Sequence, residues 1–286
     1  MRQKQFRNAP TFSALQLLAV TIQTGTPQDV ADHIAILQAS PLFAGRKAYQ
    51  SMFDKLAAVI RTGMPASPIF KLDGNSKLPF VAFSSAPAVT CPGAGACLDF
   101  CYSFRAWRFA AAYLRQAQNT YLLRHASHIV SEAFHQLPAD ITLRLYVDGD
   151  FASPADVAFW FDQLNRRPDV AAYGYSKSFS EILAYRGAWP ANYQLNISAG
   201  HCHSPAIVAA IKALPITRGE FVAVPVGHKV TGAQWGTRAL ADKVRKAGAA
   251  LGRLFVCPGS CGSCTSSGHA CGSARFAGIP IAIAMH

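Results

Sequence analysis

The sequence predicts an α/β fold in which a parallel sheet curls into a partial barrel of six strand–helix units. From residue 79 onward, short apolar or β-branched runs alternate with segments of helical periodicity. Several runs are almost continuously apolar, as parallel strands buried on both faces are. Polar residues and cysteines gather where the runs end, which is where parallel α/β folds carry functional groups. Right-handed crossovers would curl such units into an open or closed barrel, and a doubly wound sheet is the alternative.

The first part of the chain, residues 1–66, is predicted to be a helical N-terminal appendage. Thr26, Pro27 and Asp29 supply a cap, a first-turn proline and an early carboxylate, which together indicate a helix start. The appendage either covers one end of the core or binds a partner. Its helices are expected at 28–38 and 46–61, followed by a Gly- and Pro-rich linker at 62–76.

The barrel is predicted to occupy residues 67–256, and a Cys-rich metal-binding segment with a closing or edge strand to occupy 257–286. The helix after Ser153 has a capping residue directly before Pro154. Strands are expected at 79–83, 141–148, 170–176, 193–199, 221–226 and 254–257, with the last strand at 279–284. Helices are expected at 105–136, which is long enough for two, and at 154–165, 179–186, 205–214 and 233–247.

Composition limits the class of protein. The 286 residues include 27 Lys and Arg against 15 Asp and Glu, a formal net charge of +12. This excess predicts attraction to polyanions such as nucleic acid, anionic lipid or phosphorylated molecules. No apolar run approaches the roughly 18 residues of a membrane span. The basic N-terminus is interpreted as an arm before a helix, and a signal peptide is the alternative.

Cysteine usage points to metal. Seven of the eight cysteines lie in two tight groups. Scattered cysteines would suggest disulfides of an exported protein, whereas tight groups in a chain without a signal favour metal binding in a reducing compartment. We therefore expect a cytoplasmic protein.

The first group follows the first predicted strand, on a Pro- and Gly-rich loop. Cys91, Cys97 and Cys101 have the spacing C-x5-C-x3-C. Thiols spaced in this way bind zinc or an iron–sulfur cluster, and three inert buried cysteines are the alternative. Three thiolates leave the fourth iron of a cubane for a small ligand or another residue. Cys202, the cysteine outside both groups, is a candidate for that position, and a lone buried thiol is its alternative interpretation.

The second group opens where the sixth predicted strand ends. Cys257, Cys261, Cys264 and Cys271 form a complete four-thiolate set, which suits a closed cubane or a structural zinc. Spacing alone does not decide between the two. His269 could replace one ligand, although a solvent-exposed loop histidine is the simpler interpretation.

Six residues at the ends of the second, third and fourth strands are candidates for cofactor binding. A glycine there lets a ligand approach the backbone, and a carboxylate can hold an ammonium or a ribose hydroxyl. A lysine can bind a carboxylate or phosphate. Ordinary turns and solvated strand ends are the alternatives. The candidates are Asp148, Gly149, Asp150, Lys177, Asn196 and Ser198.

A basic stretch follows the first cysteine group. Arg105, Arg108 and Arg115 fall on roughly one face of the predicted helix, with Trp107 and Tyr113 nearby. Arginines among aromatic residues could bind phosphates and stack on bases. A solvated helix face is the alternative, and the arginines could also neutralise a thiolate-ligated cluster.

The chain resembles the gene product 88 domain family of phages, plasmids and bacteria over about residues 75–275. The resemblance lies in VTCPGAGACLDFCYSFRAWR, LRLYVDGDFASPADVAFWFDQLNRRPDVAAYGYSKS, ANYQLNISAG and CPGSCGSCTSSGHAC. That family looks like a divergent relative of radical S-adenosylmethionine (SAM) enzymes. Those enzymes have a partial barrel of six units, a three-cysteine loop after the first strand and a glycine–acid motif after the second.

By this resemblance Cys91, Cys97 and Cys101 would carry a [4Fe–4S] cluster, Asp150 would hold the SAM amino group, and the second cysteine group would carry an auxiliary cluster. Two features depart from the radical SAM pattern. The cysteine spacing is x5/x3 in place of x3/x2, and Asp148-Gly149-Asp150 stands where GGE is usual.

Two functions follow as hypotheses. The first is a basic iron–sulfur protein of a plasmid or phage, which acts by binding nucleic acid or a host or plasmid protein. The alternative is a radical SAM enzyme that generates a 5′-deoxyadenosyl radical on an unknown substrate. In that enzyme Asp150, Lys177, Asn196 and Ser198 would orient the cofactor, with SAM as a second cofactor. Zinc is the alternative metal at the C-terminal cysteines.

Overall fold

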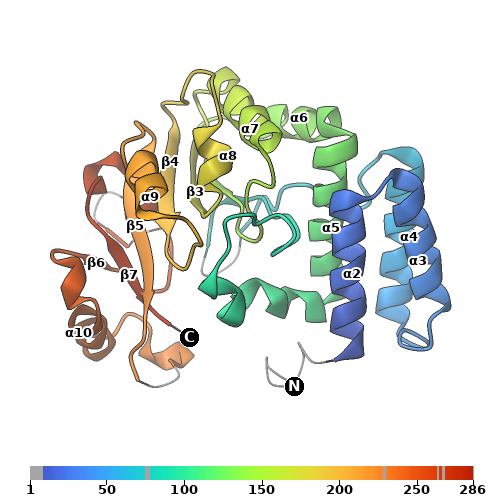
Figure 1. Cartoon of the computed structure of the whole chain (residues 1–286), viewed down its shortest axis with the longest axis horizontal. Helices are drawn as coiled ribbons and strands as arrows, with labels where there is room; N and C mark the ends of the chain where they lie inside the picture. The colour runs from blue at the N-terminus through green and yellow to red at the C-terminus, as the bar shows by residue number, and fades with distance from the viewer. Residues whose placement is uncertain (1–8, 75–77, 228–229, 263, 266–267, 286) are drawn as a thin grey trace.

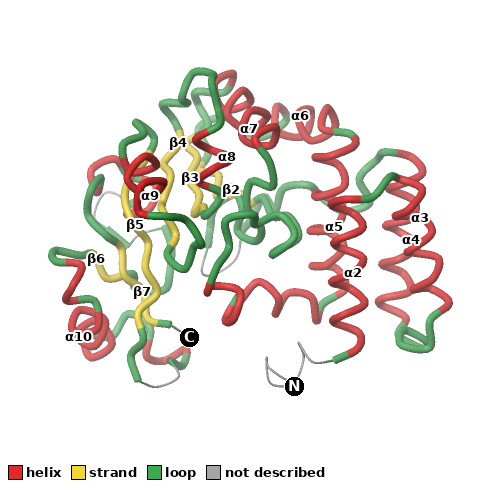
Figure 2. Tube along the Cα trace, viewed as in Figure 1, coloured by secondary structure: helices red, strands yellow, loops and turns green. Residues whose placement is uncertain are grey.

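A parallel seven-stranded sheet forms the centre of the protein, as the alternating pattern predicts (Figures 1 and 2). The structure, a computed structural model, describes residues 9–74, 78–227, 230–262, 264–265 and 268–285. The strand order is β1-β2-β3-β4-β5-β7-β6, and every described pairing is parallel. The strands are β1 Val81–Ala82, β2 Thr142–Leu145, β3 Ala171–Ser176, β4 Tyr193–Ser198, β5 Thr217–Val224, β6 Phe255–Val256 and β7 Ile281–Ala284.

The N-terminal helices α2 (Pro10–Thr24), α3 (Pro27–Ala39) and α4 (Lys47–Thr62) stand beside α5 (Ala110–His125) (Figure 1). The helix start predicted at Thr26 is confirmed. The Thr26 backbone N–H donates to Asp29 Oδ2 over 2.8 Å, and the Asp29 N–H donates to Thr26 Oγ1 over 3.2 Å. This reciprocal cap satisfies amides that would otherwise lack a partner at the helix start.

The remaining helices connect successive strands. The long stretch predicted at 105–136 divides into the 3₁₀ helix η2 (Tyr102–Arg108), α5 and α6 (Ser127–His135). Ser153 caps the next helix, because its hydroxyl accepts the Asp156 N–H over 3.2 Å. The other helices are α7 Pro154–Arg166, α8 Phe179–Leu183, α9 Pro205–Lys212 and α10 Arg238–Ala247.

The position of the last strand corrects the prediction of a closing or edge strand. β7 pairs with β5 on one side and with β6 on the other, so β6 lies at the sheet edge. The side chains of Ile281 and Ala282, which project to opposite faces of the sheet, are both fully buried, so β7 is covered on both faces. β1 and β6 lie at opposite ends of the strand order, and Ala82 of β1 also forms an antiparallel bridge with Lys71.

One hydrophobic core extends from the N-terminal helices to the sheet. It includes Leu15 of α2, Phe53 of α4 and Trp160 of α7, all fully buried. The Tyr113 hydroxyl of α5 donates to the Leu15 carbonyl over 2.6 Å. The boundary predicted at residue 66 therefore does not coincide with a break in the core. No helix in the described part of the chain is both long and apolar enough to cross a membrane.

Candidate metal centres

The first cysteine loop is bonded through its backbone to the turn after β4. The N–H groups of Gly95 and Cys97 both donate to the Gly200 carbonyl, over 3.0 and 3.3 Å. The Cys202 N–H donates to the Gly93 carbonyl over 3.1 Å. These main-chain bonds fix the loop between the ends of β1 and β4, which are distant in sequence.

Glycine is required at position 93, because the loop approaches the end of β3 closely there. A Cβ on Gly93 would collide with the Lys177 carbonyl oxygen and lie 2.5 Å from His203 Nε2. The His203 ring stacks on Phe179 with centroids 4.7 Å apart, and its Nε2 is hydrogen-bonded to the Lys177 carbonyl over 2.7 Å. His203 therefore supports the loop through packing.

The thiols of the first group share one electrostatic environment with Asp150 and Lys177. Burial is the main cause that raises the pKa of Cys91, the Asp150 carboxylate raises it further, and the Lys177 ammonium opposes the rise. Burial also raises the pKa of Cys97, and Lys177 again opposes it. Both thiols feel the charge of Cys101 as well. Cys91 and Cys97 are thus both influenced by one cation and by the third thiol.

Asp150 is buried, and its carboxylate is engaged by its own chain. It accepts hydrogen bonds from Ser176 Oγ and the Lys177 N–H, each over 2.7 Å, and from the Phe151 N–H over 2.9 Å. Burial raises the pKa of Asp150, and these bonds moderate the rise. Lys177 Nζ donates to Ser198 Oγ over 2.7 Å. The structure therefore brings three predicted cofactor residues together, while their role toward a cofactor stays a prediction.

Asp148 and Gly149 join the end of β2 to other elements. Asp148 Oδ2 accepts from Gln116 Nε2 over 2.9 Å, and Gln116 Oε1 accepts from Trp107 Nε1 over 2.7 Å. Burial raises the pKa of Asp148, against the effect of its hydrogen bonds. Gly149 has φ +80°, and a Cβ there would collide with Ser85. The close approach of Ser85 explains by itself why position 149 is a glycine, with no need for a ligand.

The second cysteine group covers one face of the sheet. Side chains alternate along a strand, so Leu143 and Leu145 of β2 face the helices while Arg144 faces the other way. On that opposite face, Tyr173 of β3 and Ile281 of β7 form a separate cluster with the C-terminal segment. The four cysteines of this segment, Cys257, Cys261, Cys264 and Cys271, all belong to that cluster.

Backbone amides point at the sulfurs of this second group. The Gly259 N–H donates to Cys257 Sγ over 3.5 Å, and the Ala270 N–H donates to Cys264 Sγ over 3.4 Å. Burial raises the pKa of Cys257 to about 12, and the Gly259 amide opposes the rise. N–H groups directed at sulfur stabilise thiolate more than thiol.

Two tyrosines and two arginines complete the surroundings of the second group. Burial raises the pKa of Cys271 to about 11, against the Tyr175 hydroxyl and the Arg218 and Arg144 cations. The Arg144 guanidinium lies 4.8 Å from the Tyr175 ring centroid, and its buried Nε has no hydrogen-bond partner among the described residues. The Tyr173 hydroxyl, on a side chain 1% exposed, also lacks a described partner and lies beside Cys261.

Asn196 and Arg218 anchor the cysteine segment to the sheet. Asn196 Nδ2 donates to the Cys271 carbonyl over 2.9 Å, and Asn196 Oδ1 accepts from Arg218 Nε over 2.6 Å. Arg218 also donates to the carbonyls of Phe276 and Ile279, over 3.0 and 2.8 Å. The prediction that Asn196 contacts a cofactor stays untested. Sequence reasoning missed Arg218, because an arginine beside a glycine gives no signal of burial.

Tyr102 and Arg144 lie between the two groups. The Tyr102 hydroxyl donates to the Val147 carbonyl over 2.9 Å. Partial burial raises the pKa of Tyr102, whose side chain is 48% exposed, while the charge of Arg144 lowers this pKa and that of Cys101 raises it. Arg144 in turn acts on Cys261. The charge of Arg144 therefore reaches both Tyr102, beside the first group, and Cys261 of the second.

Three expectations about single residues are corrected. Cys202 is exposed, because only its backbone joins the first loop, so it is not a buried thiol. His269 is partly buried, because its ring packs 4.7 Å from that of Tyr173 and its Nδ1 accepts the Gly272 N–H. Arg105 and Arg108 lie on η2 and Arg115 on α5, so an extended residue between the helices separates them and they share no helical face.

All eight cysteines are free thiols. Within the described ranges, no three His, Cys, Asp or Glu side chains converge closely enough to chelate one ion. The donor sets nevertheless fit metal–thiolate chemistry, since the second group offers four sulfurs enclosed by hydrogen-bond donors and cations, and the first offers three beside a lysine.

A family model described as gene product 88 matches residues 56–277. The chain belongs to the gene product 88 family. The match begins within α4 and ends after Cys271, so it contains strands β1 to β6 and both cysteine groups, while β7 lies beyond it. Comparisons with curated proteins and with solved structures find no match.

Proposed function

We propose that this gene product 88 protein is an iron–sulfur protein with a [4Fe–4S] cluster on each cysteine group. The observation that carries the proposal is the surroundings of Cys257, Cys261, Cys264 and Cys271. Amide N–H groups donate to Cys257 and Cys264, and tyrosine hydroxyls and arginine charges favour the thiolates of Cys261 and Cys271, all four being partly or fully buried. Buried thiols need no such donors, whereas buried thiolates do, because an uncompensated charge in the interior is costly.

The first group supports a cluster with an open position. Cys91, Cys97 and Cys101 supply three ligands, and the exposed Cys202 gives no sign of a fourth. A cubane would supply one-electron redox chemistry here. The chain itself would position a cation near the cluster. Asp150 accepts a hydrogen bond from the Lys177 backbone, and Ser198 accepts one from the Lys177 ammonium, whose charge acts on Cys97.

Metal analysis tests this proposal. Iron, sulfide and zinc are measured in anaerobically purified protein, together with its visible spectrum. About eight irons per chain support two cubanes, and about four support one. Zinc without iron would overturn the iron–sulfur proposal and leave zinc, the alternative for the C-terminal cysteines.

For the biological role, we propose that the protein acts in a plasmid or phage by binding nucleic acid or a partner protein. The net charge of +12 supports attraction to a polyanion. Helix α10 concentrates exposed basic residues, namely Arg238, Lys243, Arg245 and Lys246. Retention on immobilised DNA or RNA that falls steeply with salt would support nucleic acid. If retention does not depend on salt, or if the protein is not retained, binding to a partner protein remains as the proposed role.

A radical SAM enzyme is the second candidate. It is favoured by the influence of Asp150, Lys177 and Cys101 on both Cys91 and Cys97. In such an enzyme Lys177 and Ser198 would position the cofactor's carboxylate or hydroxyls. A change in the visible spectrum on adding SAM, with saturable binding, would support this candidate. No binding to the iron-loaded protein would remove it.

A further inference from the structure

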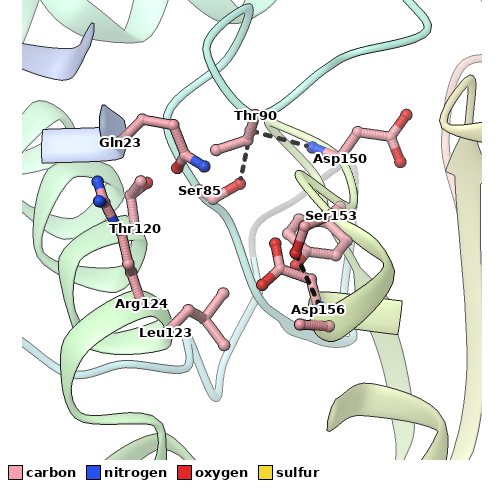
Figure 3. A pocket seen from close by; sticks show the side chains of 11 residues that line it. Gln23, Ser85, Thr90, Thr120, Leu123, Arg124, Asp150, Ser153 and Asp156 are labelled. Carbon is pink, nitrogen blue, oxygen red and sulfur yellow. Dashed lines mark hydrogen bonds between the residues drawn. The ribbon is translucent and has the colours of Figure 1, made fainter. Parts of the chain in front are cut away.

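A cavity of about 320 Å³ lies outside both cysteine groups, between the N-terminal helices and the loops at the ends of β1 and β2 (Figure 3). One wall comes from the C-terminal parts of α2 and α5, including Gln23, Leu123 and Arg124. The opposite wall comes from the β2–α7 connection, including Ser153 and Asp156. This volume is at the lower end of ligand sites, so it suits a small molecule.

The two walls carry opposite charges that do not neutralise each other. Figure 3 shows the Asp156 carboxylate on the wall across from Leu123 and Arg124. Among the described residues, no ion pair joins Arg124 to Asp156. A cavity that is negative at one wall and positive at the other repels a simple anion from one side and a simple cation from the other.

Asp156 has hydrogen-bonding capacity left over. Its Oδ2 accepts the Ala152 N–H over 3.0 Å, and the Ser153 side chain also interacts with the carboxyl, which leaves part of its capacity of about four hydrogen bonds unused. Burial raises the pKa of this carboxyl, with the Ala152 and Ser153 hydrogen bonds opposing the rise, and no cation is among the causes. In a protein with a large excess of positive charge, a half-buried carboxylate without a cation is a candidate ligand-binding group.

Arg124 also keeps free donors. Its two terminal nitrogens donate to the carbonyls of Ile22 and Thr24, over 3.4 and 3.1 Å, which places the guanidinium at the end of α2. A guanidinium has five N–H donors, so those two bonds leave others for a ligand. The Gln23 side chain lines the same wall and adds an amide.

The floor of the cavity is the back of the first cysteine loop. Thr90 Oγ1 contacts Ser85 Oγ over 3.0 Å, accepts the Asp150 N–H over 3.3 Å, and directly precedes Cys91. Tyr146, which also lines the cavity, has φ +55°, a conformation that costs energy for a bulky residue. The cavity is therefore built on a constrained part of the chain.

We infer that this cavity binds a small zwitterion of the size of a free amino acid, with its ammonium group on Asp156 and its carboxylate toward Arg124 and Gln23. Each end of such a molecule meets the opposite charge. The inference is independent of the metal content, since no cysteine side chain lines the cavity.

Calorimetric titration of the full chain tests the inference. The probes are the twenty standard L-amino acids, followed, for each that binds, by its deaminated acid and its decarboxylated amine. We expect saturable binding of at least one amino acid, and binding about tenfold or more weaker for both truncated analogues, because each lacks one charge-assisted contact. Failure of all twenty to bind would overturn the inference.

Asp156→Asn provides the decisive variant. An asparagine can still accept the Ala152 N–H, so the variant should fold, which circular dichroism checks. We expect it to bind the amino acid about tenfold or more weakly. The matched control is Asp242→Asn, whose carboxylate pairs with Arg245 on the distant helix α10 and should leave affinity unchanged. If Asp156→Asn binds the amino acid with unchanged affinity, the amino acid binds at another place on the protein and the inference is overturned.

Discussion

At the scale of single residues, surroundings separate the cysteines into two kinds. The seven clustered thiols are partly or fully buried, and Cys202 is exposed. Burial raises the pKa of Cys257 and Cys271, so in metal-free protein both remain protonated at neutral pH. A metal would have to displace those protons, and the amide and tyrosine donors lower the cost of doing so.

Substituting single cysteines should reveal this difference. We expect Cys202→Ser to keep the full iron content, because that side chain faces solvent. Cys271→Ser should lose about half of the iron of a two-cluster protein, because it removes one of four ligands. Iron and sulfide analysis after anaerobic purification measures both. Iron loss in Cys202→Ser would assign that residue as a ligand after all.

Asp156 makes a prediction about pH. Burial raises its folded-state pKa above the unfolded value, so the native state holds the proton more tightly and stability falls as pH rises through that window. Without ligand, Asp156→Asn should therefore be more stable than the parent at pH 7, by about 1 kcal/mol or less. The difference should vanish once the pH falls below the unfolded pKa. Thermal unfolding of both proteins across pH measures it, and a variant less stable at pH 7 would contradict it.

At the scale of elements, the C-terminal cysteine segment acts as a second layer on the sheet. It leaves β6, covers the face that the helices do not, and returns as β7 between β5 and β6. Asn196 and Arg218 bond this segment to β4 and β5. Since the segment carries all four ligands of one proposed cluster, its attachment to the sheet determines where that cluster lies.

Removing the anchor should destabilise the fold. We expect Asn196→Ala to cost about 2–4 kcal/mol, because it leaves the buried Arg218 Nε and the Cys271 carbonyl without their partners. Asn165→Ala is the control, since Asn165 is exposed and donates only to the Ala188 carbonyl, and it should cost less than about 1 kcal/mol. Urea denaturation measures both, and equal costs would contradict the anchoring role.

Arg144 should influence the electron affinity of the second centre. Replacing it by glutamine removes a positive charge near Cys261 and Cys271. The reduced cluster is the more negative state, so its reduction potential should fall, by on the order of 50–100 mV. Arg275→Gln is the control, because Arg275 is exposed although only four residues beyond Cys271. Redox titration followed by EPR measures the reduction potential of both variants. Equal changes in potential would argue against proximity of Arg144 to the cluster.

At the scale of the whole molecule, the N-terminal helices and the sheet share one core. Phe12 of α2 packs against Phe104 of η2 with ring centroids 5.1 Å apart, and Tyr49 of α4 donates to the Trp107 carbonyl over 2.9 Å. These contacts place α2–α4 directly behind the first cysteine loop. The helices are therefore in a position to brace that loop.

Truncation tests the predicted boundary. If residues 1–66 are removed, we expect the remaining chain to be insoluble or to lack cooperative unfolding, because Trp107 and Tyr113 lose the apolar surface that covers them. Circular dichroism and size-exclusion chromatography measure this. A soluble, cooperatively folding fragment of residues 67–286 would show that the helices are a separable appendage.

The sequence alone determined the α/β class, the parallel sheet and the two cysteine groups, because these depend on local spacing and on the apolar pattern of each strand. It also determined that the candidates Asp150, Lys177 and Ser198 meet, since the carboxyl ends of parallel strands lie at one edge. The buried role of Arg218 and the exposure of Cys202 depend on contacts between distant segments, and no local pattern encodes them.

Only the tertiary structure decided the position of β7, the burial of the second cysteine group and the cavity between Arg124 and Asp156. β7 pairs with both β5 and β6, and its two faces are covered by distant parts of the chain, since Ile281 packs with the cysteine segment and Ala282 with α10. The cavity exists because a helix end and a loop from different parts of the chain approach without filling the space between them. Such arrangements depend on packing between segments that are distant in the sequence, and local sequence patterns do not predict that packing.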